Sequence, residues 1–150
     1  MERLKTEVIN AFITLTENIN NSRTNVLDFG SEDMTFYRGE IHMIKMIGDY
    51  PGIFSSEIAR RFGITRAVVH KTLLKLEDRG LVTREPCEED KKKHKLFLTE
   101  KGRLAYGYHE EYHNKYDRIL FDYVAELPDS QLEAIKGFLE RASSLIKNHA

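Results

Sequence analysis

Positively charged side chains gather in one short segment of this chain. Arg66, His70, Lys71 and Lys75 follow one another at helical spacing, and no acidic residue separates them. Lysine and arginine are the side chains that bind DNA phosphates, and arginine also binds the edge of guanine through two hydrogen bonds. The segment therefore indicates a contact with nucleic acid, and the alternative is a helix face that is merely solvated.

Small side chains lie among these charges at the start of the same segment. A helix that enters the major groove of DNA needs small and basic residues in its first two turns. Thr65, Ala67 and His70 meet this requirement together with the arginine, and the methyl group of Ala67 could meet a thymine methyl. The two lysines are expected to hold the DNA backbone instead. Leu74 also faces outward, and the pattern assigns it no role.

A second basic cluster follows in the segment "EEDKKKHK". Three acidic residues come first, and the lysines come after them in what reads as the tip of a β-hairpin. Such a tip would reach the adjacent minor groove or its phosphates, and the alternative is a solvated turn. With one serine ahead of the first cluster, the predicted DNA contacts are Ser55, Thr65, Arg66, Ala67, His70, Lys71, Lys75, Asp90, Lys91, Lys92 and Lys93.

The bulk composition limits the kinds of protein that this chain can be. Its 150 residues suit one compact domain, and 41% hydrophobic residues can form a core. The net charge is -1, so contact with nucleic acid must come from local clusters of charge. Cys87 is the single cysteine, which excludes internal disulfides and multi-cysteine metal centres. No apolar run approaches the roughly 18 residues of a membrane span. The first residues lack a signal-peptide pattern, so we expect a cytoplasmic protein without a membrane partner.

Periodic apolar residues predict the helices at both ends of the chain. A first amphipathic helix covers about 1–21, and a second runs from Thr35, its expected N-cap, to "GDYPG". A long helix begins after Thr99 and carries tyrosines, and a final helix follows Pro128. The apolar stripes of the flanking helices are too long to leave exposed, so we expect a symmetric dimer to bury them.

Capping and turn signals predict a smaller unit in the middle of the chain. Ser55 or Ser56 caps a short helix that ends at Gly63, and Thr65 caps the basic helix, which ends at Gly80. Two β-leaning runs, "LVTRE" and "KLFLT", follow as a hairpin with a charged tip. Two helices joined by a tight turn and followed by a two-stranded wing form a winged helix-turn-helix.

The predicted fold is mainly α, of the α+β kind, a winged helix-turn-helix with long N- and C-terminal dimerisation helices. We expect 1–150 to form a single domain. Within it, about 35–98 form the DNA-binding lobe, and about 1–21 and 99–148 form the dimerisation helices. The inner stripe of the basic helix is expected to consist of Val69, Leu73 and Leu76.

These residues and their spacing resemble the MarR family of transcriptional regulators. The resemblance runs from about Thr35 to Arg103 and is densest in "SSEIARRFGITRAVVHKTLLKLEDRGLVTRE" and "EEDKKKHKLFLTEKGR". Its most specific parts are the "LE-x-x-G-L-V" ending of the basic helix, Asp90 in the wing, and "L-T-E-K-G" from Leu98 to Gly102. By this resemblance, the chain is a homodimer with interlocked terminal helices, and its two wings span a pseudopalindromic operator in double-stranded DNA. Members usually repress, and they lose affinity for DNA when a ligand or an oxidant reaches the site between the dimer and DNA-binding lobes.

The chain departs from the family pattern at three places. Hydroxyl residues often stand where this chain has Ala67 and Val68. The wing arginine after the aspartate is here Lys92, which keeps the charge but loses the planar fork. Cys87 lies in the wing, whereas the redox-sensing branches place their cysteine near the N-terminal helices. We therefore interpret Cys87 as an ordinary wing residue.

Histidines of two predicted helices form a candidate effector site. His109 and His113 are spaced i, i+4, so on a helix they point the same way and can share a metal ion. By resemblance to the family, the helix of His42 and Glu40 packs against this long helix, and some members sense zinc with histidines of these helices. One alternative is that the histidines are polar core or interface residues. Another is an apolar pocket for an organic effector, lined by tyrosines and Phe121, with a fatty-acyl ligand suggested by other branches. The candidate metal ligands are His42, His109 and His113, and no cofactor is required.

The predicted function is a sequence-specific DNA-binding transcriptional regulator, a ligand-responsive repressor that acts as a homodimer. An enzyme is the competing class, but the sequence contains no glycine-rich phosphate loop and no nucleophile motif. The alternative within the same fold is a winged-helix module that binds a protein instead of DNA. Near-neutral net charge and the missing hydroxyl groups keep this alternative open.

Overall fold

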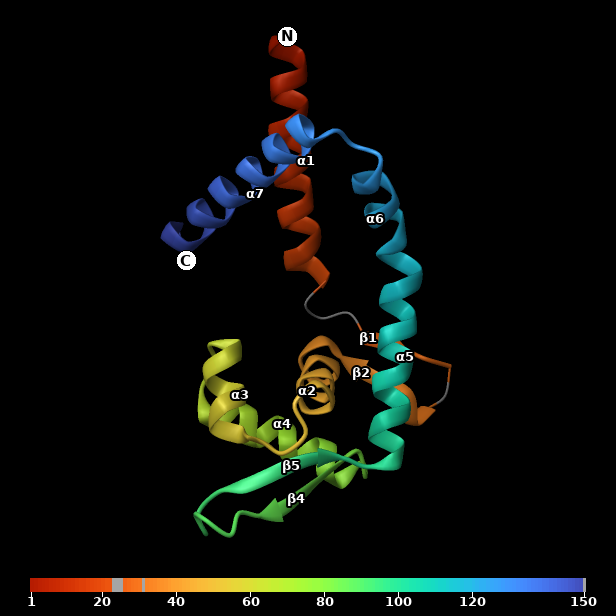
Figure 1. Ribbon diagram of the computed structural model, residues 1–150, viewed down its shortest axis with the longest axis vertical. Coiled ribbons are helices and arrows are strands. Elements are labelled where there is room, and N and C mark those ends of the chain that lie inside the picture. The colour runs from red at the N-terminus through yellow and green to blue at the C-terminus, as the bar shows by residue number, and fades with distance from the viewer. Residues whose placement is uncertain (23–25, 31, 150) are drawn as a thin grey trace. The chain divides into compact units, whose positions relative to one another are not determined.

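The computed structural model describes residues 1–22, 26–30 and 32–149. The chain divides into two compact units, Met1–His109 and Glu110–Ala150. The first unit contains α1 (Glu2–Asn21), β1 (Val26–Asp28), η2 (Glu32–Met34), β2 (Thr35–Tyr37), α2 (Arg38–Asp49), β3 (Ile53–Phe54), α3 (Ser55–Phe62), α4 (Arg66–Asp78), β4 (Val82–Pro86), β5 (His94–Leu98) and the start of α5 (Glu100–Tyr116). The second unit contains the end of α5, then α6 (Arg118–Ala125) and α7 (Asp129–His149) (Figure 1).

The first unit confirms the winged helix-turn-helix fold. Helices α3 and α4 follow each other through a short turn, and β4 and β5 form the antiparallel wing, with Thr83 opposite Phe97. Two small features were missed from the sequence. Strand β3 adds to β5, so the wing sheet has the order β3-β5-β4, and β1 pairs with β2 in a separate sheet. Strands of two or three residues are too short to show an alternating pattern.

One side of α4 is buried in the core of the first unit. Val69, Leu73 and Leu76 are fully buried, as the sequence predicts. They pack in one cluster with the isoleucines of α2 and with Leu96 of the wing. Each buried leucine or isoleucine contributes about 1.5–3 kcal/mol to folding. The orientation of α4 is therefore fixed by the core, and its opposite side is left to solvent.

The ends of α4 follow the predicted capping pattern. The Thr65 side chain accepts a hydrogen bond of 3.2 Å from the backbone N–H of Val68. The chain turns into α4 at Gly63 and out of it at Gly80, with φ of 65° and 71°, a region that favours glycine. A helix that is fixed at both ends and buried along one side can present its outer residues in a defined place.

Two of the predicted caps were wrong. Thr35 lies in β2, and the N-cap of α2 is Tyr37, whose backbone N–H donates to the Glu40 side chain. Ser55 is the first residue of α3, and Phe54 stands at the N-cap without a side-chain hydrogen bond. Pairing of β1 with β2 takes Thr35 into a strand, so α2 begins later than the threonine pattern indicates. Helix α3 instead begins earlier than the serine pattern indicates, directly after strand β3.

The turn between β5 and α5 ties the wing to the end of α4. Thr99 donates a hydrogen bond from Oγ1 to the carbonyl oxygen of Gly80 at 2.6 Å and accepts one from the N–H of Gly102 at 3.0 Å. A Cβ atom on Gly102 would lie 2.1 Å from the carbonyl oxygen of Leu81. This close approach explains physically why threonine and glycine stand at these two positions of the "L-T-E-K-G" segment.

The flanking helices have the predicted apolar stripes, but the last part of the chain is divided differently. The long helix predicted from Thr99 ends at Tyr116, and a separate α6 begins at Arg118 after Asp117. No residue of α1 or α6 is buried. Among the described residues, none of the helices combines the length and apolarity that crossing a bilayer requires.

Candidate nucleic-acid interface

Every residue predicted to contact DNA is exposed in the structure. The members from the helices lie at the start of α3 and on the outer side of α4, and the members from the wing lie between β4 and β5. The exposed residues are Ser55, Thr65, Arg66, Ala67, His70, Lys71, Lys75, Asp90, Lys91, Lys92 and Lys93. Six of them line two cavities beside the wing: Thr65, Arg66 and Lys93 line the first, and Ser55, Asp90 and Lys92 line the second together with Arg66 and Lys93.

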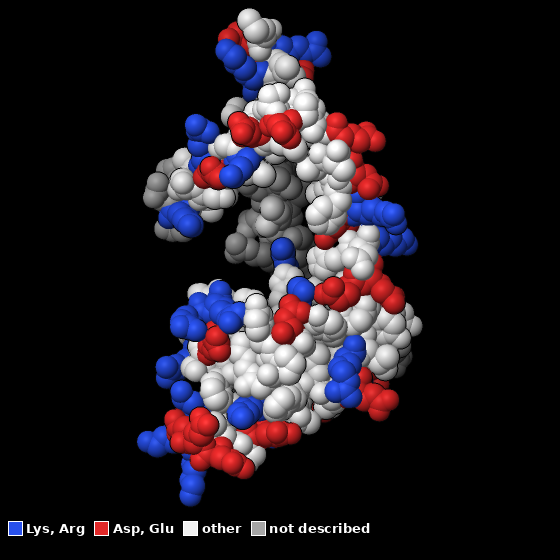
Figure 2. Space-filling model, viewed as in Figure 1, with Lys and Arg blue, Asp and Glu red and all other residues white. Residues whose placement is uncertain are grey.

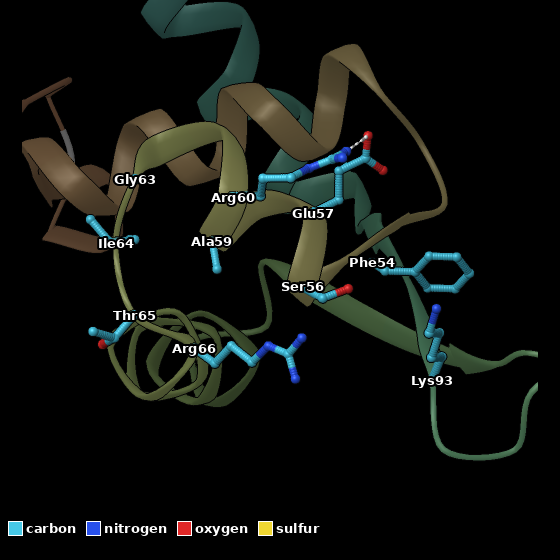
Figure 3. A pocket seen from close by; sticks show the side chains of 10 residues that line it. All are labelled: Phe54, Ser56, Glu57, Ala59, Arg60, Gly63, Ile64, Thr65, Arg66 and Lys93. Atoms are coloured by element: carbon cyan, nitrogen blue, oxygen red, sulfur yellow. Dashed lines mark hydrogen bonds and ion pairs between the residues drawn. The ribbon is translucent and has the colours of Figure 1, made fainter.

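A groove of about 770 Å³ lies between α3, the start of α4 and the wing. Figure 3 shows the Arg66 side chain extending from α4 toward Ser56 and the wing, with Lys93 rising from the wing toward Phe54. The Lys93 ammonium lies 5.2 Å from the centre of the Phe54 ring, within the range of a cation–π contact. Two cations from distant parts of the sequence therefore face the same space.

A second cavity of about 390 Å³ is lined by several of the same residues. Arg66 and Lys93 line both cavities, and the wing adds Lys92 to the second one. Arg84 also lines it, and its guanidinium group pairs with the carboxylate of Glu77 near the end of α4. Arg84 thus links the wing to α4 beside the second cavity.

The cations of α4 differ from those of α3 in their partners. In α3, Arg60 and Arg61 both pair with Glu57, at 3.4 and 2.9 Å. In the part of the chain that the structure describes, no ion pair engages Arg66 or the two lysines of α4. Figure 2 shows the Lys and Arg side chains over α3 and at the wing, with acidic side chains of the wing among them. The charge of α4 is therefore available to an external anion.

The wing tip is a defined turn. Asp90 accepts a hydrogen bond from the N–H of Lys92 through its carboxylate and one from the N–H of Lys93 through its backbone carbonyl, both at 3.0 Å. The N–H of Cys87 donates to the carbonyl of Lys93 at 3.1 Å and closes the base of the turn. The structure gives Asp90 a positioning role for the lysines, since its own charge would repel phosphate. Cys87 is buried, in line with its interpretation as an ordinary wing residue.

Some residues of the groove were not found from the sequence. Phe54, Ser56 and Arg60 line its walls and Arg84 lines the second cavity, and none of them is among the predicted DNA contacts. They come together only because β3 pairs with β5 and sets the start of α3 beside the wing. A two-residue strand gives no signal for this pairing in the sequence.

The candidate metal ligands are placed as follows. The rings of His42 and His109 lie with their centres 5.8 Å apart, and His109 is buried. In the second unit, Nδ1 of His113 lies 3.0 Å from the carboxylate of Asp117. Among the described residues, no group of three or more His, Cys, Asp and Glu side chains could hold a metal ion. Within the first unit, the structure therefore places two of the three histidines side by side.

A charged network lies beside this histidine pair. The carboxylate of Asp49 accepts a hydrogen bond from the Tyr106 hydroxyl and lies 3.1 Å from the Lys45 ammonium. Burial raises the pKa of Asp49. Hydrogen bonds from Tyr106 and Lys45 and the charges of Lys45 and His109 outweigh this effect and hold the pKa below its ordinary value. The network connects α2 with α5.

Comparison with known proteins finds a family match within the first unit. A family model described as the MarR family matches residues 38–93, which run from α2 to the wing. This is the middle of the region that shows the resemblance in the sequence. This part of the chain is therefore similar to the MarR family.

Two relatives from Bacillus subtilis (strain 168) carry the similarity further. The HTH-type transcriptional regulator PchR is 28% identical over 107 residues, which cover 71% of this chain and 63% of PchR. The uncharacterized HTH-type transcriptional regulator YybA is 33% identical over 75 residues, half of each chain. The chain thus matches between half and just under two thirds of these relatives' lengths. The family is one of transcriptional regulators and not of enzymes.

Solved structures share the fold along nearly the whole chain. FabT of Streptococcus pneumoniae, solved in complex with DNA, superposes with a TM-score of 0.69 at 22% identity and covers 100% of both chains. ZitR of Lactococcus lactis, a zinc-responsive MarR family member, superposes with a TM-score of 0.77 at 19% identity. It covers 95% of this chain and 99% of its own. At these identities, the likeness establishes the winged fold with its terminal helices.

Proposed function

We propose that this chain is a DNA-binding transcriptional regulator that acts as a homodimer on a pseudopalindromic operator. One observation carries the proposal: Arg66 of α4 and Lys93 of the wing face one groove, and the exposed side of α4 has cations without acidic partners in the described part of the chain. DNA is the polyanion whose grooves accept a helix and a wing together. FabT and ZitR, which share the fold, have both been solved with DNA.

The proposed contacts follow from the position of each side chain. Arg66, at the first turn of α4, reads a guanine edge or clamps a phosphate, because its guanidinium group presents two parallel donors. Lys71 and Lys75 hold the phosphates along the outer side of α4. The positive end of the α4 dipole adds to the attraction of phosphate at the first turn. Lys92 and Lys93 contact the backbone beside the adjacent minor groove.

The proposed dimer is supported by apolar surface that the chain leaves exposed. Apolar side chains of α1, α6 and α7 remain exposed, and a cavity of about 640 Å³ in the second unit is lined by Val124, Leu132, Ile135 and Leu139. Patches of this kind on a folded chain mark interaction sites. A second copy with the same stripes is the partner that a two-fold axis supplies.

Salt-dependent binding tests this function. The full chain is titrated into labelled duplexes from its own promoter region at several salt concentrations, with fluorescence anisotropy as the readout. We expect affinity to fall steeply as salt rises, and Lys92→Gln or Lys93→Gln to lower the slope by roughly 0.9 for each phosphate that the variant no longer neutralises. Lys5→Gln, an exposed lysine of α1, is the matched control and should leave the slope unchanged. Binding that is absent, or independent of salt, would instead favour a module that binds a protein.

We further propose that the regulator is a repressor released by an effector held near His42 and His109. The two rings adjoin each other, and the zinc-responsive ZitR shares the fold. Zinc is one candidate effector, and a small apolar ligand among the neighbouring aromatic residues is the other. Zinc content after equilibration is measured in the wild type, in His42→Ala and, as control, in His70→Ala. Equal zinc content in all three would reject the metal and leave the apolar ligand.

A further inference from the structure

The outer side of α4 exposes apolar side chains that the core does not use. Val68 is 50% exposed and Leu74 is 46% exposed, although their neighbours Val69 and Leu73 are fully buried. Ala67 is exposed as well. On an α-helix, Ala67 and Leu74 lie on one face, seven residues apart, and Val68 flanks it. This apolar set therefore belongs to the surface that the proposed function turns toward DNA.

Val68 offers its methyl groups and nothing else to a ligand. Its backbone N–H is already bound to the Thr65 hydroxyl at 3.2 Å. Its branched Cβ restricts the side chain to one main rotamer in a helix. The corresponding third position of α2 is Glu40, whose carboxylate accepts a hydrogen bond from the helix start. A glutamate at this place in α4 would meet phosphate, whereas valine presents a fixed apolar surface without charge.

The surroundings of this apolar set restrict what can cover it. Arg66, His70, Lys71 and Lys75 all lie on the exposed side of the same helix. An apolar protein surface would have to bury these cations, at a cost in desolvation. A ligand that fits both features is a polyanion that also carries methyl groups. The major groove of DNA meets this description, because thymine exposes its C5-methyl group there between the phosphates.

We propose that Val68, together with Leu74, recognises thymine C5-methyl groups in the half-site. This inference rests on the proposed DNA-binding function. The other major-groove groups at the base edges are hydrogen-bond donors or acceptors, and an isopropyl group would strip water from them without a replacement bond. Val68 therefore favours thymine over cytosine at the position it contacts. The absence of hydroxyl groups at 67 and 68 becomes a specificity feature of this chain.

Deoxyuridine substitution tests the proposal, because it removes only the C5-methyl group of thymine. The full chain first selects a duplex from a random pool, and each thymine of that duplex is then replaced singly. For the wild type, we expect about a fourfold loss of affinity at one or two positions in each half-site, since a buried methyl group is worth about 0.8 kcal/mol. Val68→Ala should bind the thymine and deoxyuridine duplexes almost equally at one of these positions. Val26→Ala, an exposed valine of β1, should keep the wild-type difference.

The outcomes distinguish a failure of methyl recognition from a failure of the proposed DNA-binding function. If the chain selects no duplex, the DNA-binding function itself fails. If it binds the selected duplex tightly but no deoxyuridine position weakens binding, methyl recognition is wrong and DNA binding stands. If positions respond to deoxyuridine equally in the wild type, in Val68→Ala and in Leu74→Ala, the assignment to these two residues is overturned. Circular dichroism of the variants establishes that they fold, as their exposed positions lead us to expect.

Discussion

The winged lobe and the flanking helices use the same kind of apolar stripe with opposite results. In the lobe, 35–98, the stripes of α2 and α4 meet each other and the wing, and Ile44 and Leu73 are fully buried. In α6, Ile119 is 73% exposed, and none of the described residues of α1 is buried. The sequence patterns are alike, so the difference lies in the partners. The lobe completes its core within one chain, whereas the flanking helices leave apolar side chains exposed, which in the proposed dimer a second surface covers.

The largest expected effect comes from breaking that second surface. Leu139→Ser replaces an apolar residue of α7 that lines a cavity of the second unit. Burial of one leucine is worth about 1.5–3 kcal/mol, and a two-fold interface contains it twice, so dimerisation should weaken by about 3–6 kcal/mol. Sedimentation equilibrium measures the dissociation constant. Glu133→Ser, also on α7, is the control that should remain dimeric. A wild-type chain that sediments as a monomer would contradict the proposal that a second copy covers the flanking helices.

The next effect sharpens the contrast within α4 itself. Leu73→Ala removes a fully buried side chain and should lower the free energy of unfolding by about 2–5 kcal/mol. Leu74→Ala, the adjacent and half-exposed leucine, should change it by about 0.5 kcal/mol or less. Urea unfolding at one fixed protein concentration measures both variants, since the stability of a dimer depends on concentration. Equal losses would show that the outer side of α4 is also part of a core.

The smallest effect concerns the charged network at the edge of the lobe. The pKa of Asp49 is lower in the folded chain than its ordinary value of 3.8. The ionised carboxylate therefore stabilises the fold above pH 3.8, and this contribution is lost as the pH falls through the lower folded value. The side chain is a third exposed, so we expect less than about 1 kcal/mol.

The variant Asp49→Asn tests whether the ionised carboxylate of Asp49 stabilises the fold. Urea unfolding of the wild type and the variant is compared from neutral pH down to about pH 3, where the carboxylate begins to lose its charge. The difference in stability between the two proteins should shrink as the pH falls. Tyr106→Phe removes only the hydrogen bond to the carboxylate and should show the same trend more weakly. A difference that grows in acid would contradict the direction of the pKa shift.

The parts of the fold that the sequence predicted are those set by neighbours along the chain. Thr65, Gly63 and Gly80 bound α4 through local capping, and the stripe of Val69 and Leu73 follows helical spacing. Strands β1, β2 and β3 were missed because two or three residues are too few to show an alternating pattern, and β3 also depends on pairing with the distant β5. The pairing of β1 with β2 moved the N-cap of α2 from the predicted Thr35 to Tyr37.

The candidate site was predictable to the same extent. Arg66 and the wing lysines stand out as charge clusters, and the structure turns both toward one groove. Phe54 lines that groove and Arg84 lines the second cavity because of tertiary pairing, so no local pattern could single them out. The histidine spacing was a weaker signal: a spacing of four residues places two side chains on one helix side, but it does not provide a third ligand.

The affinity of Arg66→Ala for the selected operator duplex tests the central claim most directly. Arg66 lines the groove at the first turn of α4, and Arg3 of α1 serves as the matched arginine outside the lobe. Loss of a base contact should weaken binding by about 1–3 kcal/mol and relax the preference at one base pair, whereas Arg3→Ala should bind as the wild type does. If Arg66→Ala binds the duplex with wild-type affinity and preference, α4 is not the element that reads DNA.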